Sequence, residues 1–177
     1  GLSLLNLINS KNLIYLTHET AHLQTGRRFG DFHSGFNFSL ETIFGFDNAY
    51  NLHFENYVPT PEENAKIFVA GINQEELNSK YVWENKTESI TPTDASFFLV
   101  NKMGNLRYNL FGPLTVENVD GDLINYINYL NSEGDDYTKK EHLNQSMIST
   151  GLSMLTWDSI RALWNYNIHG ENETEVT

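Results

Sequence analysis

The first part of the chain has the pattern of one long helix. From Leu2 to Thr25 it contains neither proline nor glycine, and the next residue, Gly26, is a common helix stop. Its apolar residues approximate the helical period; they are Leu2, Leu5, Ile8, Leu13, Leu16, Ala21 and Leu23. We therefore expect an α-helix over residues 2–25. Side chains four positions apart share one face of such a helix, so His18 and His22 are expected side by side.

Further helix signals follow along the chain. Ser39 is typical of an N-cap, and Thr60 followed by Pro61 is typical of another helix start. A short helix is expected to end at Gly134, and one or two more are expected between residues 137 and 170. Most of the chain is therefore expected to be helical.

One stretch favours β-structure instead. The runs Phe97–Val100 and Leu106–Phe111 are rich in residues with high strand propensity, and a Met-Gly-Asn turn separates them. This pattern predicts a small β-hairpin near residues 96–111.

The length and composition indicate one globular domain. The chain has 177 residues, of which 40% are hydrophobic, and this is enough to bury a core. We expect a single domain over residues 1–170, of class α+β and predominantly helical, with the candidate active helix at 2–25. The acidic tail over residues 171–177 is expected to fray.

The charge of the chain argues against a nucleic-acid partner. The formal net charge is -12, with eleven Lys and Arg residues scattered among twenty-three Asp and Glu residues. A nucleic-acid interface needs clustered basic side chains, and an anionic membrane surface is disfavoured for the same reason. The chain has no cysteine, so any zinc ion must be held by His, Asp or Glu.

No stretch of the sequence predicts a membrane span or an intact signal peptide. The apolar runs are far shorter than the roughly 20 residues that cross a bilayer, and the first residues lack a basic segment and a cleavage site. We expect a soluble chain from which upstream sequence or a signal has been removed. The compartment and the oligomeric state stay open.

The stretch "HETAH" places His18, Glu19 and His22 in the spacing H-E-x-x-H. Two imidazoles on one helical face can hold a single zinc ion, and the intervening glutamate is near enough to reach a water on the metal. Zinc lowers the pKa of that water, and the glutamate can accept its proton during attack on a carbonyl. The pattern therefore indicates a hydrolytic zinc site.

Residues from about 13 to 41 resemble the zincin superfamily of zinc metallopeptidases, of the gluzincin type. The resemblance implies that His18 and His22 bind one zinc ion and that Glu19 is the general base. In gluzincins a glutamate from the next helix completes the metal site. Glu41, nineteen residues after His22, corresponds to it.

The residues leave the third ligand open. Beside Glu41, the candidates are the acids and the histidine that follow the first helix or lie in "GINQEEL", namely Asp31, His33, Asp47, Glu75 and Glu76.

The leading hypothesis is a zinc-dependent hydrolase of the metallopeptidase type, in which metal-activated water attacks an amide carbonyl of a peptide or protein substrate. One alternative is an acidic helical interaction domain without enzymatic activity, in which "HETAH" is helix surface. Another is a metal-binding protein without hydrolytic activity.

Overall fold

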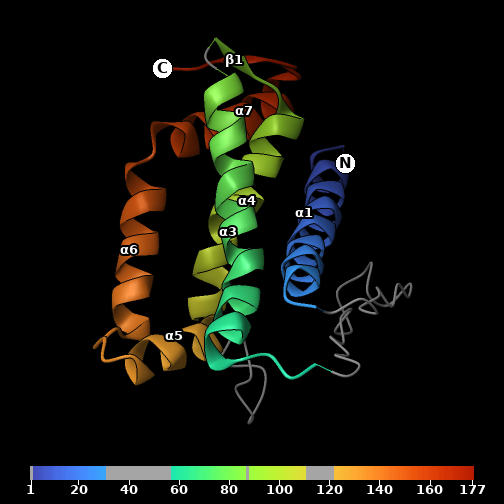
Figure 1. Cartoon of the computed structure of the whole chain (residues 1–177). Helices are drawn as coiled ribbons and strands as arrows, with labels where there is room; N and C mark the ends of the chain where they lie inside the picture. The colour runs from blue at the N-terminus through green and yellow to red at the C-terminus, as the bar shows by residue number, and fades with distance from the viewer. Residues whose placement is uncertain (1, 31–56, 87, 111–121) are drawn as a thin grey trace.

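The computed structural model describes residues 2–30, 57–86, 88–110 and 122–177 (Figure 1). These residues form six α-helices and two short strands. They are α1 (Leu2–Arg28), α3 (Pro61–Asn85), β1 (Ser89–Ile90), α4 (Pro92–Leu110), α5 (Asp122–Ser132), α6 (Lys139–Leu152), α7 (Met154–His169) and β2 (Thr174–Glu175). The prediction of a predominantly helical α+β chain is confirmed. The helix expected from Ser39 lies outside the described residues.

The helices α3 and α4 form the centre of the structure. Helix α1 packs against both of them on one side, and α6 packs against α4 on the other (Figure 1). Helix α7 and the two strands cover one end, and α5 packs against α3 at the opposite end. This arrangement buries one face of α1 against α3, and that face carries the "HETAH" histidines.

The start of α3 shows why this central helix forms where it does. Thr60 is the N-cap, its side chain accepts a hydrogen bond from the backbone N–H of Glu63, and the Glu63 side chain bonds back to the Thr60 backbone. Pro61 occupies the first helical position, as the sequence predicted. A second capping box, made by Thr138 and Glu141, begins α6.

The predicted β-hairpin near residues 96–111 is wrong, because residues 92–110 form helix α4. Thr91 and Asp94 exchange side-chain and backbone hydrogen bonds at its start, and Pro92 lies between them. The apolar run that favoured a strand instead buries Phe98 against α3 and α7. Capping and packing therefore override the strand propensity of this segment. The small antiparallel sheet pairs Ser89–Ile90 with Thr174–Glu175.

The acidic C-terminal segment makes defined contacts with the rest of the structure. It contains β2, and beyond this strand the Thr177 backbone N–H donates to Asp158 Oδ2 at 3.0 Å. The Thr177 hydroxyl donates to the other Asp158 oxygen, and Arg161 donates to the Glu175 carbonyl. Because Asp158 and Arg161 lie on α7, this helix holds the chain end in place.

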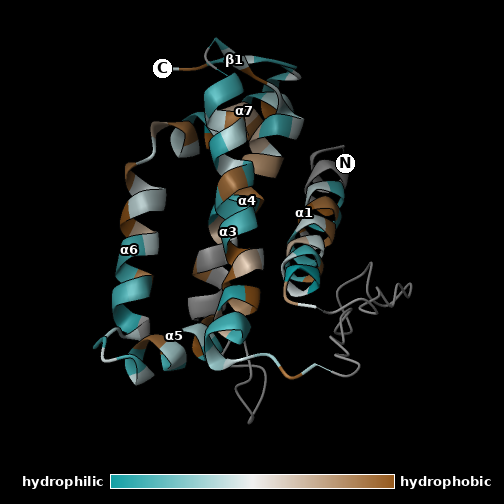
Figure 2. Ribbon diagram, viewed as in Figure 1, coloured by the Kyte–Doolittle hydropathy of each residue, from teal (hydrophilic) through white to brown (hydrophobic). Residues whose placement is uncertain are grey.

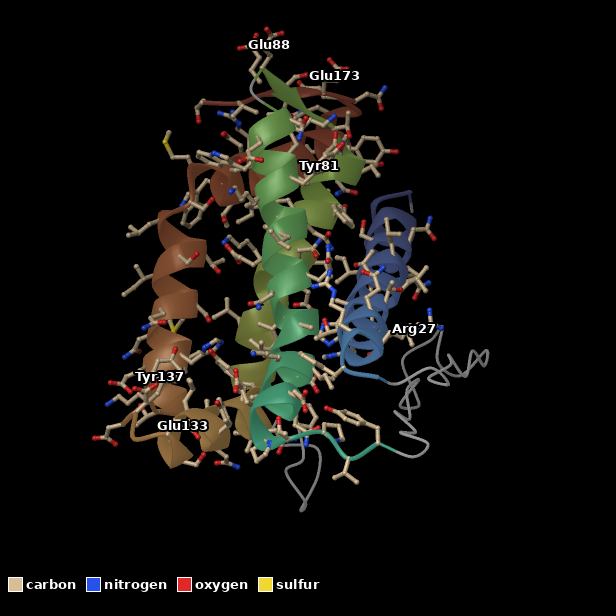
Figure 3. The ribbon with its side chains drawn as sticks, viewed as in Figure 1. Arg27, Tyr81, Glu88, Glu133, Tyr137 and Glu173 are labelled. Atoms are coloured by element: carbon tan, nitrogen blue, oxygen red, sulfur yellow. The ribbon has the colours of Figure 1, made fainter. Side chains whose placement is uncertain are left out.

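Among the described residues, two apolar clusters join several of the helices. The first joins α3, α4, α7 and β1 and consists of Val82, Ile90, Ala95, Phe98, Leu155 and Ala162. The second joins α3 to α5 through Ile72, Leu123 and Ile127, with Tyr137 packed against it near the junction of α5 and α6 (Figure 3). This second cluster fixes the start of α5 against α3. Asp122 is the first residue of α5.

Hydrophilic and hydrophobic residues are interspersed along α1, α3 and α6 (Figure 2). Within the described ranges, no helix combines the length and the apolar character needed to cross a membrane.

Candidate metal centre

The site begins with the face that α1 presents to α3. His18 and His22 lie one helical turn apart on this face, and both are buried, His18 with only 3% of its surface exposed. His22 Nδ1 lies 2.6 Å from the backbone oxygen of Ile67, and His18 Nδ1 lies 2.8 Å from Glu75 Oε1. Both partners belong to α3. Helix α3 therefore orients both rings through their Nδ1 atoms.

The other nitrogen of each ring faces Asp122. The two Nε2 atoms are 3.0 Å apart, and Asp122 Oδ2 lies 3.3 Å from that of His18 and 3.2 Å from that of His22. Asp122 is half-buried and reaches the site from the first turn of α5. One oxygen and two nitrogens, all of them able to bind a metal, thus form a nearly equilateral triangle.

Hydrogen bonding fixes which ring nitrogens carry protons. The Ile67 carbonyl and the Glu75 carboxylate can only accept, so each Nδ1 must be the donor. In a neutral imidazole this leaves the lone pair on Nε2. Two such lone pairs 3.0 Å apart, facing a carboxylate oxygen, repel one another unless a cation lies among them. The triangle is therefore a place for a proton or a metal ion.

In the absence of a metal, the neighbouring carboxylates favour the protonated form of His18. Burial by itself would lower the pKa of His18, but hydrogen bonds and charge interactions with Asp122 and Glu75 raise it to about 9. Burial would likewise raise the pKa of Asp122, but its hydrogen bonds with His18 and His22 and their charges hold it well below the usual range. The environment thus favours positive charge on His18 and negative charge on Asp122.

Glu19 lies buried beside the two histidines. Burial raises the pKa of its carboxyl group, the nearby imidazoles partly offset this effect, and Asp122 and Glu75 add to it. Glu19 is therefore close enough to interact electrostatically with both histidines and with both other carboxylates.

The site as a whole carries an excess of negative charge. Three carboxylates, of Glu19, Glu75 and Asp122, surround two imidazoles. The largest hydrogen-bond and charge effects on the pKa values of Glu19, Asp122 and His18 come from other members of this group. If both imidazoles are neutral, as metal-binding imidazoles are, three ionised carboxylates would leave three negative charges, and a divalent cation would offset two of them.

Two glycines provide the space that the site needs. A Cβ added to Gly71 of α3 would lie 2.4 Å from His18 Nε2, and one added to Gly104 of α4 would lie 1.6 Å from Glu75 Oε2. Any side chain at either position would therefore displace a residue of the site.

The structure brings together His18, Glu19 and His22, as the sequence predicted. Of the third-ligand candidates, Glu75 contacts the Nδ1 of His18 rather than the Nε2 triangle, and Glu76 pairs with Lys102 instead. The other four lie outside the described residues; they are Asp31, His33, Glu41 and Asp47.

Sequence reasoning missed Asp122, which lies 104 positions after His18. An acidic residue at a helix start is most simply read as a match to the helix dipole. The one available signal was an acid at a helix start, and this signal is too common to select Asp122.

Comparison of the chain with protein-family models, curated proteins and solved structures gives no match. The site's own residues therefore carry the functional assignment.

The close approach of Gly71 to His18 yields a stability prediction. We expect Gly71→Ala to have a free energy of unfolding about 1–3 kcal/mol below that of Gly151→Ala, because the added methyl overlaps the imidazole. Gly151, also helical, is the matched control, since a Cβ there meets no atom within 4 Å. Urea unfolding of both variants measures the difference. Equal stabilities would show that the ring does not pack on Gly71.

Proposed function

We propose that this chain is a zinc-dependent hydrolase whose metal is held by His18, His22 and Asp122. The observation that carries the proposal is the triangle of His18 Nε2, His22 Nε2 and Asp122 Oδ2, with sides of 3.0, 3.2 and 3.3 Å. Ligands about 2.0–2.2 Å from a tetrahedral zinc ion are separated from one another by roughly 3.3–3.5 Å. The three donor atoms are thus already close to the spacing that zinc requires.

The hydrogen bonds around the triangle support the same assignment. Metal-binding histidines usually donate their other N–H to a carboxylate or a backbone carbonyl. His18 donates to Glu75 and His22 to the Ile67 carbonyl, so both rings aim Nε2 at the triangle. Two imidazoles and one carboxylate suit zinc, and three protein ligands leave a position for water, as in catalytic zinc sites.

Zinc in such a site would make water acidic enough to act as a nucleophile and would polarise a carbonyl group. Glu19 would accept the proton of the attacking water and later deliver it to the leaving group. Burial raises the pKa of Glu19, which brings the carboxyl group closer to the range in which proton transfer is efficient.

The substrate class comes from the resemblance of the "HETAH" helix to zincins. We propose an amide bond in a peptide or protein. In this proposal Asp122 is the third ligand. The gluzincin pattern implies Glu41, which lies outside the described residues and stays a prediction.

A metal-binding protein without hydrolytic activity is the second candidate. It is favoured by the burial of both histidines and by the way the site joins three helices, α1, α3 and α5. In that case the metal ion would serve the stability of the fold.

Zinc titration tests the ligand set. We expect the metal-free protein to bind one equivalent of zinc, and Asp122→Ala to weaken the affinity by more than about 100-fold, beyond the 10–100-fold typical of residues outside the ligand set. Asp135→Ala, which removes an exposed acid, should bind like the wild type. Calorimetry with a competing chelator measures both. An Asp122→Ala affinity equal to that of Asp135→Ala would exclude Asp122 as a ligand.

Glu19→Gln separates the two candidate functions. We expect this variant to keep one equivalent of zinc but to hydrolyse fluorescently labelled casein about 10²–10⁴ times more slowly, because the amide cannot accept a proton. An unchanged rate would remove Glu19 from the mechanism. Stoichiometric zinc without hydrolysis by the wild type, on casein and on a mixed peptide library, would favour the metal-binding protein.

A further inference from the structure

Glu75 is the most enclosed acidic side chain of the site. Only 2% of its surface is exposed, and its Oε1 accepts a hydrogen bond from His18 Nδ1 at 2.8 Å. Its second oxygen, Oε2, is buried and has no hydrogen-bond partner among the described residues. Burying a carboxylate with half its hydrogen-bonding capacity unused is costly. A residue held this way at a metal-binding histidine points to a role in the site.

The Glu75 carboxylate packs against the α4 backbone at Gly104. A Cβ there would lie 1.6 Å from Glu75 Oε2 and 2.6 Å from the carboxyl carbon, so the carboxylate rests directly against the bare helix backbone. Glu75 therefore lies between two helices, with Oε1 directed at α1 and Oε2 seated on α4. The α4 backbone therefore limits the space into which the carboxylate could move away from His18.

We propose that Glu75 is a positioning residue that orients His18 for metal binding, and that Gly104 makes this possible by leaving room for the carboxylate. Glu75 does not act as a ligand in this scheme, because its Oε1 faces Nδ1 and the metal-binding atom of His18 is Nε2. A carboxylate at Nδ1 also makes Nε2 a stronger electron-pair donor. The inference rests on the proposed metal site.

This scheme predicts that α4 influences metal affinity without supplying a ligand. The path runs from Gly104 through Glu75 to the His18 ring, and each step is a direct contact.

Cobalt(II) binding, followed by its visible absorption spectrum, tests the role of Glu75. We expect Glu75→Ala to weaken cobalt affinity by about 10–100-fold and to alter the spectrum. Glu75→Gln should lose less, since its carbonyl oxygen can still accept from Nδ1–H, and it retains the side-chain size if the alanine variant does not fold. Glu76→Gln is the matched control, because Glu76 pairs with Lys102 and should leave cobalt affinity unchanged.

A double-mutant cycle tests the contact with Gly104. We expect Gly104→Ala alone to weaken cobalt affinity about tenfold, and to have little further effect in the Glu75→Ala background, where no carboxylate is left to displace. Additive losses in the cycle would show that Gly104 acts independently of Glu75.

A metal-independent measurement separates this inference from the metal site itself. The His18 Nδ1–H proton, assigned by NMR of the metal-free protein with ¹⁵N-labelled histidine, should give a slowly exchanging signal in the wild type and in Glu75→Gln. It should be lost in Glu75→Ala. If the wild type binds no cobalt but the signal follows this pattern, the metal proposal fails and Glu75 still orients His18. A signal and a cobalt affinity that both persist in Glu75→Ala would overturn the inference.

Discussion

The close approach of two imidazole Nε2 atoms to each other and to Asp122 is the constraint on which this structure depends. Both rings donate through Nδ1 to acceptors on α3, so their lone pairs meet 3.0 Å apart next to a carboxylate. This arrangement is stable only with a cation among the three atoms. A proton can serve in the metal-free protein, and the three donor atoms are of a kind that could also bind a divalent metal ion.

The packing of the helices brings these three atoms together. Helix α1 supplies two nitrogens, α3 supplies the acceptors that orient them, and α5 supplies Asp122, whose neighbour Leu123 packs on α3 through the second apolar cluster. Two glycines allow the helices to approach: Gly71 gives room to the His18 ring, and Gly104 gives room to Glu75. The site as a whole therefore draws on four helices, of which two, α1 and α5, supply the residues proposed to hold the metal.

The sequence predicted what local geometry determines. His18, Glu19 and His22 share a helical turn, so their proximity follows from the period of the helix, and the start of α3 follows from Thr60 and Pro61. Asp122 could not be found in this way, because a contact 104 positions away depends on how α5 packs. The hairpin prediction failed for a related reason. Phe97–Val100 has strand propensity, but Thr91 and Asp94 cap a helix there, and Gly104, taken as a turn residue, is the point where α4 accommodates Glu75.

The most direct test of the metal centre is X-ray absorption at the zinc edge of the zinc-loaded protein. If His18, His22 and Asp122 hold the metal, the spectrum will show nitrogen and oxygen ligands at about 2.0–2.2 Å together with the outer scattering of two imidazole rings. The imidazole scattering will fall to that of one ring in His22→Ala. Zinc without imidazole scattering, or a spectrum unchanged in His22→Ala, would contradict the account.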